Sequence, residues 1–505
     1  MIRLPNLENP LAVGAATRYE QIAKTIYQAI EAGTLKPGDR LPTVRRLASD
    51  LGVSLTTVSA AFRWLAEEGW TRGEIGRGTF VAERGKQESA AAVQTVSVPR
   101  TVHRWQGGKA PWRKRAMMSL VDRLRSTFPD ATDCSAGRPD PSLLPFKLIK
   151  RHWKSAIEDV SHGDLQYATV DPVPALAEIL EKRLKSEGLP INGGDLVVGT
   201  STQQFISLAT EVVRRLGGAT EPIFAVEQPG HYSFFDTWDR SGVGMIGVET
   251  DEHGAMPQSL ETAIRGGANA VLLTPRAHNP TGASWTPERM RALGDVLSRY
   301  PDVLAIEDDH FGDIAQASAG SLLADARIEE RVIYIRSVSK SVAPDLRLCV
   351  AAARRRLKTV LQDAKSHADG WSSRLLQRVL VGVLRDEELA PWFARVQQIY
   401  RARRERVAEV FQRGSPGVVT RPGSDGVNVW IHLPAGLDAN EVIERAAELG
   451  VLVAPGEVFY LSPGHSDVIR FNAGSVEIEQ ATVCAGLLAK AIHQSPGARS
   501  TAIHV

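Results

Sequence analysis

Lys340 is the residue whose surroundings in the sequence best suit covalent chemistry. It closes the run Ser337-Val-Ser-Lys340, which directly follows an apolar run, and Arg347 lies seven residues further on. A lysine amine can form a Schiff base with an aldehyde cofactor, and serine hydroxyls together with an arginine can hold a phosphate on that cofactor. A Ser-x-Ser-Lys run is a weak signal by itself, because most such lysines are surface residues. Its weight depends on the motifs that accompany it.

Other polar motifs occur in a fixed order along the chain. They are Tyr167 ahead of an Asp-Pro pair, Gly199-Thr-Ser-Thr-Gln-Gln204, Glu227-Gln-Pro-Gly-His231-Tyr232, Ala277-His-Asn279-Pro-Thr-Gly282, Glu307-Asp308-Asp-His310 and Val468-Ile-Arg470-Phe-Asn. Amides and hydroxyls at the start of a helix, as expected for residues 199–204, can cradle a phosphate. Each motif alone is explained as readily by a loop carboxylate, a turn residue or a surface charge. The ordered set favours one shared site.

Apolar runs that could form strands precede most of these motifs. They cover residues 195–198, 222–227, 270–274, 303–307 and 331–336, with helical patterns between them. Runs that are apolar along their whole length predict a mainly parallel sheet covered by helices on both faces, hence an α/β domain over residues 128–495. Ligands of such sheets bind at the carboxyl ends of the strands, which is where the polar motifs fall.

The first eighty residues have a different pattern, that of three short helices and a hairpin. Apolar residues recur at helical spacing within residues 19–30, 44–51 and 58–65, and residues 70–81 contain the glycines of a hairpin. We interpret residues 15–82 as a winged helix-turn-helix, whose recognition helix must present short polar side chains to the major groove of double-stranded DNA. The alternative is a three-helix module that binds protein. The expected DNA contacts are Arg45, Ser54, Thr56, Thr57, Ser59, Arg63 and Arg77.

Residues 83–127 are expected to form a basic linker. This stretch has ten basic and three acidic residues, a net charge of +7, whereas the whole chain of 505 residues carries only +2. The linker charges could contact DNA phosphates, or they could simply keep a solvated tether from associating with itself.

Composition narrows the class of protein further. No apolar stretch approaches the roughly 20 residues of a membrane span, and the first residues have no signal-peptide core. The three cysteines lie far apart, and no histidine and cysteine pairs have metal-ligand spacing. We therefore expect a cytoplasmic protein without structural disulfides, metal or membrane attachment.

Both parts of the chain resemble known families. The run from Leu41 to Ser54, together with Thr57-Val58 and Gly76-Arg-Gly-Thr-Phe-Val81, resembles the GntR family of bacterial regulators. The ordered motifs around Lys340 resemble the fold-type I aminotransferases over roughly residues 130–495. Joined in one chain, the two parts look like a member of the MocR regulators, in which an aminotransferase-like domain senses cofactor or ligand.

The resemblance implies roles for the motif residues in binding pyridoxal 5'-phosphate and an effector. Lys340 would form the Schiff base, Asp308 would pair with the ring nitrogen, and Asn279 would donate a hydrogen bond to the ring oxygen. Arg470 would take the carboxylate of an amino acid in a bidentate pair. The phosphate ligands would be Ser201, Thr202, Ser337 and Arg347, with Tyr167 reaching the phosphate from the second subunit of a homodimer.

The sequence departs from the family pattern at four places. Leu55 stands where the recognition helix usually has an arginine, and Ser201 replaces the usual glycine of the phosphate loop. His310 replaces the tyrosine beside the ring oxygen; it can still donate a hydrogen bond, but its charge depends on pH. His231 aligns with the aromatic residue that stacks on the cofactor ring, and Tyr232 is next to it, so either could stack.

The combination predicts a homodimeric transcription regulator that binds promoter DNA and responds to pyridoxal phosphate or to an amino acid or amine. An active aminotransferase with an appended DNA-binding head is the alternative. A third possibility keeps DNA binding and reduces the large domain to a dimerisation scaffold. We expect regulation to be the main function, with transamination at most a residual half-reaction.

Overall fold

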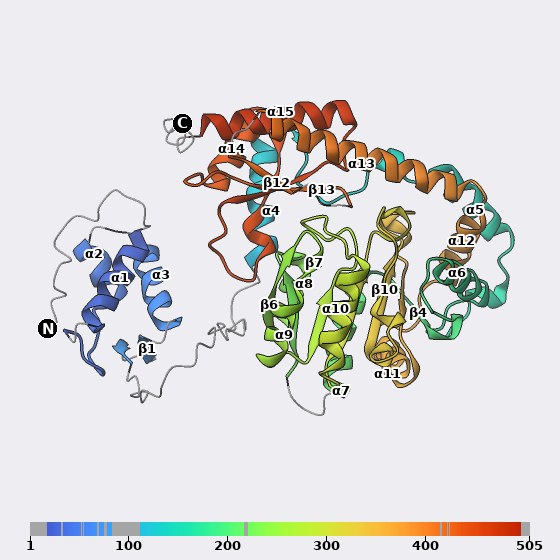
Figure 1. Ribbon diagram of the computed structural model, residues 1–505, viewed down its shortest axis with the longest axis horizontal. Coiled ribbons are helices and arrows are strands. Elements are labelled where there is room, and N and C mark those ends of the chain that lie inside the picture. The colour runs from blue at the N-terminus through green and yellow to red at the C-terminus, as the bar shows by residue number, and fades with distance from the viewer. Residues whose placement is uncertain are drawn as a thin grey trace. The chain divides into compact units, whose positions relative to one another are not determined.

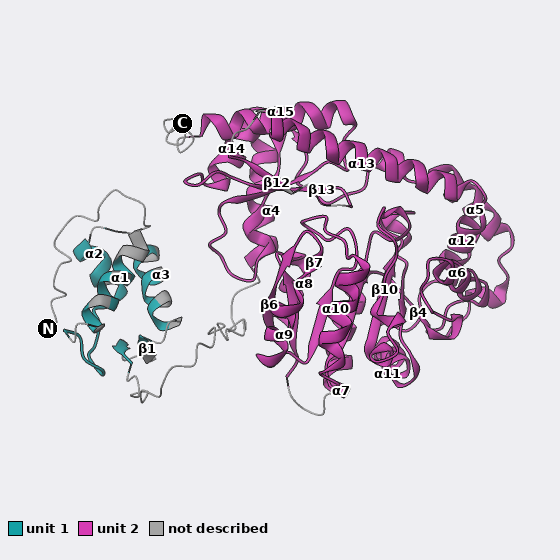
Figure 2. Cartoon of the chain, in the orientation of Figure 1, with its two compact units in different colours: residues 1–97 teal, residues 98–505 magenta. Residues whose placement is uncertain are grey.

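The computed structural model contains two compact units, residues 1–97 and 98–505 (Figure 2). The structure describes residues 18–31, 34–51, 53, 55–67, 70–74, 78–82, 112–216, 221–414, 417–421, 423 and 425–495. Each unit has its own buried apolar core.

The first unit has the three helices and the hairpin expected of a winged helix-turn-helix. Its elements are α1 (Arg18–Glu31), α2 (Val44–Leu51), α3 (Leu55–Glu67), β1 (Thr71–Glu74) and β2 (Gly78–Val81). The two strands pair antiparallel with Thr71 opposite Val81. Ile22, Ile26, Leu47 and Val58 are buried together, because the apolar positions of each helix recur on one face.

The second unit is built on a sheet of eight strands in the order β4-β11-β10-β9-β8-β5-β6-β7. Strands β10, β9, β8, β5 and β6 run parallel, whereas β11 is antiparallel to both of its neighbours and β7 is antiparallel to β6. The five apolar runs of the sequence correspond to β4, β5, β8, β9 and β10. The strands are β4 (Leu196–Gly199), β5 (Ile223–Gln228), β6 (Gly244–Asp251), β7 (Gly254–Ala255), β8 (Ala270–Leu273), β9 (Leu304–Asp309), β10 (Val332–Ser337) and β11 (Cys349–Ala352).

Helices cover both faces of this sheet (Figure 1). Side chains of one strand alternate between the two layers, so that Phe224 and Val226 pack with α7, α8 and α11 while Ala225 packs with α6, α9 and α10. These helices are α5 (Phe146–Glu158), α6 (Pro174–Ser186), α7 (Thr202–Leu216), α8 (Tyr232–Arg240), α9 (Pro257–Arg265), α10 (Pro287–Ser298), α11 (Arg355–Ala368) and α12 (Arg374–Arg385).

A smaller region, formed mainly by residues that come after the eight-stranded sheet in the sequence, has its own apolar core. It combines a four-stranded sheet, in the order β12-β13-β16-β15, with the long helix α13 and two further helices. Strand β14 (Val451–Leu452) pairs parallel with β3 (Thr132–Asp133). The remaining elements are α13 (Leu389–Gly414), β12 (Val419–Arg421), β13 (Asn428–His432), α14 (Ala439–Glu448), β15 (Ala454–Pro455), β16 (Val468–Asn472) and α15 (Ile478–Gln494).

The predicted linker over residues 83–127 is wrong at its C-terminal end. Residues Trp112–Thr127 form helix α4, which belongs to the second unit. Arg113 is fully buried, and its guanidinium donates to Asp236 and Asp239 of α8 and to the carbonyls of Tyr460 and Leu461. The high positive charge suggested a solvated tether, but one of its arginines is an internal partner for two carboxylates. Residues 83–111 lie outside the described part of the chain.

Three further findings concern the class of protein. Within the described ranges, no helix is both long and apolar enough to cross a membrane. No group of three potential metal ligands occurs among the same residues. Cys134, Cys349 and Cys484 are all buried thiols without a disulfide.

Candidate functional site

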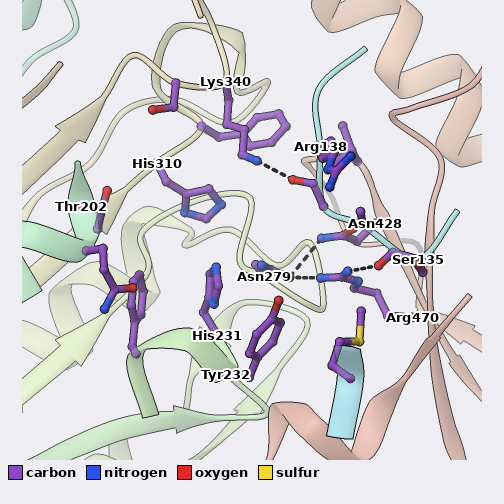
Figure 3. A pocket seen from close by; sticks show the side chains of 18 of the residues that line it. Ser135, Arg138, Thr202, His231, Tyr232, Asn279, His310, Lys340, Asn428 and Arg470 are labelled. Carbon is purple, nitrogen blue, oxygen red and sulfur yellow. Dashed lines mark hydrogen bonds between the residues drawn. The ribbon is translucent and has the colours of Figure 1, made fainter. Parts of the chain in front are cut away.

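A cavity of about 410 Å³ opens at the carboxyl ends of β9 and β10. Asp308 reaches it from β9, Ser337 from the end of β10, and Lys340 from the loop that follows. Helix α4, the segment Ser135–Arg138, β13 and β16 form the opposite wall (Figure 3). The cavity brings together all but two of the residues that the sequence assigned to cofactor and carboxylate binding. Those it contains are Ser201, Thr202, His231, Tyr232, Asn279, Asp308, His310, Ser337, Lys340 and Arg470.

Lys340 is partly buried in this cavity, and its Nζ donates a hydrogen bond to the carbonyl of Gly137. Burial lowers the pKa of this amine to about 8, and the positive charge of Arg470 contributes to the lowering. A larger fraction of this amine is therefore neutral at pH 7 than of an unperturbed lysine. Only the neutral amine is a nucleophile, so the site prepares Lys340 to attack a carbonyl carbon.

Asp308 is buried at the end of β9, and its Oδ1 has no hydrogen-bond partner in the described residues. Its Oδ2 lies 3.2 Å from Nδ1 of His310, which also lacks an aligned partner there. A buried carboxylate oxygen without a donor is rare in folded proteins, and it calls for a group that the chain itself does not supply. A protonated ring nitrogen would satisfy it.

Arg470 is buried in the middle of β16, with its guanidinium 4.7 Å from the ring centre of Phe459. Its Nη1 donates to Oδ1 of Asn279 at 3.1 Å and its Nη2 donates to the carbonyl of Ser135, while Nε has no partner in the described residues. Burial lowers its pKa to about 10. No described carboxylate forms an ion pair with Arg470, so the guanidinium is available for an incoming carboxylate.

Comparison with known proteins matches both units of the chain. Residues 141–486 match the aminotransferase class I and II family, and residues 18–81 match the gntR family of bacterial regulatory proteins. The chain is 31% identical over 450 residues to the vitamin B6 salvage pathway transcriptional repressor PtsJ of Salmonella typhimurium, covering 88% of this chain and 92% of that protein. It is 27% identical over 468 residues to the HTH-type transcriptional regulator TauR of Rhodobacter capsulatus, covering 88% and 90%. This chain belongs to the MocR subfamily of GntR transcription regulators.

Solved structures agree with the fold of the large MocR unit. A kynurenine aminotransferase of Pyrococcus horikoshii superposes with a TM-score of 0.67 at 24% identity, over 74% of this chain and 93% of that chain. The predicted α/β fold of the aminotransferase type, with a GntR module at the N-terminus, is therefore confirmed. Family membership makes pyridoxal 5'-phosphate the cofactor. Two features of the pocket fit this cofactor. The lowered pKa of the Lys340 amine suits its aldehyde, and the unpartnered Oδ1 of Asp308 suits its protonated ring nitrogen.

One end of the MocR pocket, which we call the hydroxyl end, is lined by Ser201, Thr202 and Ser337. It lies at the start of α7. Thr202 is buried there, and Ser201 Oγ accepts a hydrogen bond from the backbone of Gln204. Ser337 Oγ accepts one from the backbone of Ser339. The first turn of a helix together with hydroxyl groups suits a phosphate, because the helix amides carry partial positive charge.

A chain of polar side chains that the sequence did not predict, partly buried and partly exposed, supports the start of α7. Gln204 Oε1 accepts from the backbone of Thr200 at 2.8 Å, and its Nε2 donates to Asp369 at 2.6 Å. Asp369 in turn accepts from Lys365 at 2.6 Å, and Lys365 is fully buried. Any side chain on Gly199 would meet Gln204 Oε1 at 2.6 Å. Gln204 and Asp369 are 165 residues apart, so no local pattern could have indicated this bond.

His231 and Tyr232 both line the pocket, so both remain candidates for stacking on the cofactor ring. His231 caps the N-terminus of α8, where its Nδ1 accepts a hydrogen bond from the backbone of Ser233 at 3.2 Å. Burial lowers its pKa to about 3, so the ring is neutral at physiological pH and carries its proton on Nε2. A neutral ring can lie against a cationic ring without charge repulsion.

Two predicted cofactor ligands lie outside the cavity of this chain. Arg347 is exposed after the turn Pro344–Leu346 and has a left-handed backbone conformation, with φ of 49°. Tyr167 is 87% exposed and lies edge-on to Trp371 at 5.3 Å. The prediction for Tyr167 concerned the site of a second subunit, so a position outside its own pocket is compatible with it. Both assignments stay predictions.

The predicted DNA-contacting residues of this MocR regulator are only partly described. Thr57 and Ser59 lie on α3 and are partly exposed. The backbones of Arg45, Thr56 and Arg63 belong to α2 and α3, but their side chains lie outside the described part. Ser54 and Arg77 lie wholly outside it.

Helix α4 and the segment after it contribute pocket residues that sequence reasoning missed. Met117, Val121 and Asp122 line the cavity from α4, and Arg138 lines it from the following segment. The apolar spacing that starts at Met117 was the one available signal, and the surrounding charge obscured it.

Proposed function

We propose that this MocR regulator changes its DNA binding in response to ligands of the Lys340 pocket, namely pyridoxal phosphate and an amino acid or amine effector. One observation carries the proposal. A GntR module and a pocket that gathers Lys340, Asp308 and Arg470 occur in a single chain. Their fusion in one chain favours a function in which ligand binding in the pocket affects DNA binding by the GntR module.

The pocket residues divide between cofactor and effector. Asp308 would hold the ring nitrogen, Asn279 and His310 would hold the ring oxygen, and the hydroxyls of Ser201, Thr202 and Ser337 would hold the phosphate. When bound, pyridoxal phosphate supplies an aldehyde carbon that condenses with primary amines. Lys340 would occupy that carbon in the absence of effector, and an effector amine would compete with Lys340 for it. Arg470 would take the effector carboxylate.

Regulation requires two states that the ligand distinguishes. Release of Lys340 and neutralisation of Arg470 change contacts on the wall formed by residues 135–138, because the carbonyls of Ser135 and Gly137 hold these two cations in the present structure. Only such a difference in contacts lets a ligand shift a conformational equilibrium. A homodimer would bring two heads to paired half-sites on DNA.

The test measures DNA affinity with and without ligands. An operator is selected in vitro from genomic fragments with the full-length protein, and its Kd is measured by fluorescence anisotropy with no ligand, with pyridoxal phosphate, and with that cofactor plus a panel of amino acids. At least one ligand should change the Kd. Lys340→Ala should abolish the amino acid response and retain operator binding. An affinity that no ligand alters would reject the proposal.

The second candidate is an aminotransferase half-reaction. It is favoured by the presence of Lys340, Asp308, Asn279 and Arg470 in one cavity. Steady keto acid release from an amino donor, lost in Lys340→Ala, would support it. Effector binding without product release would leave regulation as the function.

A further inference from the structure

The charges that face the pocket do not balance. The cationic side chains in its wall are Arg125, Arg138, Lys340 and Arg470, and the acidic ones are Asp122 and Asp308. Asp122 is already paired with Arg125, at 2.6 Å. The cofactor would account for two more groups, because Asp308 faces its ring nitrogen and Lys340 its aldehyde carbon. Arg138 and Arg470 remain without a carboxylate partner among the described residues.

The backbone next to Arg138 runs close to Lys340 and Arg470. The preceding residue, Gly137, accepts the hydrogen bond from Lys340. A Cβ atom on Gly137 would lie 3.6 Å from Nη1 of Arg470, so this segment passes in contact with that guanidinium. Arg138 itself is exposed, and no described residue forms a hydrogen bond or ion pair with its side chain. In Figure 3 Arg138 and Arg470 lie on one side of the pocket, across from Thr202 at its hydroxyl end.

The positions of the two arginines suggest a ligand with two acidic groups. The phosphate of the cofactor belongs at the hydroxyl end, away from both guanidinium groups. One α-carboxylate can neutralise Arg470 and leaves Arg138 unpaired. Met117 and Val121 of α4 line the same pocket and offer an apolar surface to a short hydrocarbon chain.

We propose that the effector is an acidic amino acid, whose α-carboxylate binds Arg470 and whose side-chain carboxylate binds Arg138. This inference rests on the proposed function and narrows it, because it assigns the chemical class of the effector. Arg138 is a specificity residue here: a charge-assisted pair with it strengthens binding of an acidic side chain and contributes nothing to a neutral one. Because Arg138 is exposed, we expect the preference to be at most about fivefold.

The experiment is a spectral titration of the full-length holo-protein. L-glutamate and L-2-aminoadipate are compared with the uncharged L-glutamine and L-norleucine, and O-phospho-L-serine tests whether a phosphate serves as well as a carboxylate. The acidic amino acids should bind up to about fivefold more tightly than the uncharged ones. Arg138→Met should remove this difference by weakening the acidic ligands alone. Arg123→Met is the matched control, because Arg123 lies on α4, is not among the described residues that line the pocket and is already paired with Glu444, and it should keep the preference.

The possible outcomes separate the two proposals. Equal affinity for glutamate and glutamine, or a preference that survives Arg138→Met, would overturn the acidic effector and leave ligand-responsive regulation intact. A preference for phosphoserine over both dicarboxylic amino acids would also overturn it, in favour of a phosphate ligand. If no amino acid alters either the spectrum or the operator affinity, the proposed function itself fails.

Discussion

Replacing Arg113 by methionine should destabilise the large unit far more than the same change at an exposed arginine of helix α4. The Arg113 guanidinium is fully buried, with Nη1 2.5 Å from Asp239 and 3.2 Å from Asp236, and it also donates to two backbone carbonyls at 2.6 and 2.8 Å. Methionine fills similar volume but leaves the two carboxylates without their cation. Breaking a buried pair in this way costs about 3–5 kcal/mol.

The expected change in melting temperature follows from the size of the unit. With an unfolding entropy of about 2.1 cal/mol/K per residue, a unit of about 400 residues loses roughly 5 °C in Tm for a cost of 4 kcal/mol. Arg123→Met is the matched control on the same helix, because the Arg123–Glu444 pair is about half exposed. Its loss should cost at most about 1 kcal/mol, or roughly 1 °C.

The assay is thermal unfolding of the holo-protein followed by circular dichroism. Adding Asp239→Asn to Arg113→Met should recover part of the lost Tm, because an amide at that position carries no charge in need of a partner. The reasoning is refuted if Arg113→Met melts within 1 °C of Arg123→Met, or if the double variant melts below the single one.

Three other predictions concern cofactor binding. The rate at which pyridoxal phosphate is incorporated should rise about tenfold per pH unit below pH 8 and level off above it, because the pKa of Lys340 is lowered to about 8 and only the neutral amine reacts. Stopped-flow absorbance measures this rate. A plateau reached only above pH 10 would contradict the prediction. Lys365→Met should raise the Kd for pyridoxal phosphate severalfold by loosening the loop at the start of α7. Lys358→Met on the same helix should not, since the Lys358 amine pairs with Asp171; equal effects of the two variants on equilibrium titrations would count against the polar chain. Gly199→Ala should weaken cofactor binding in the same titration, because the added methyl group displaces the Gln204 side chain, and an unchanged Kd would show that the loop tolerates the displacement.

The sequence predicted those parts of the molecule whose signals are local. The buried strands appear as apolar runs, and the polar motif after each run lies where the strand ends, so Asp308 and Lys340 could be assigned to one site before any coordinates were known. The helices of the N-terminal module were equally visible, since each has a regular apolar period and a glycine stop.

The features that escaped prediction depend on contacts between distant residues. Arg113 reads as one more charge in a basic stretch until Asp236 and Asp239, more than 120 residues away, are placed beside it. The same holds for Gln204 and Asp369, which are 165 residues apart. Strands as short as β12 and β15 have too few residues to show an alternating pattern, so the smaller sheet was missed.

Helix α4 has two features that matter for a ligand-responsive regulator: it lines the pocket, and it is the described element that comes next in the sequence after the DNA-binding unit. Residues Met117 and Val121 form part of the chamber that receives the ligand, and the helix begins at Trp112, the first described residue after the DNA-binding unit. An effector too bulky for the pocket would therefore press against this helix, which is about 24 Å long. A ligand in the pocket would thus lie against the described helix that follows the N-terminal unit most closely in the sequence.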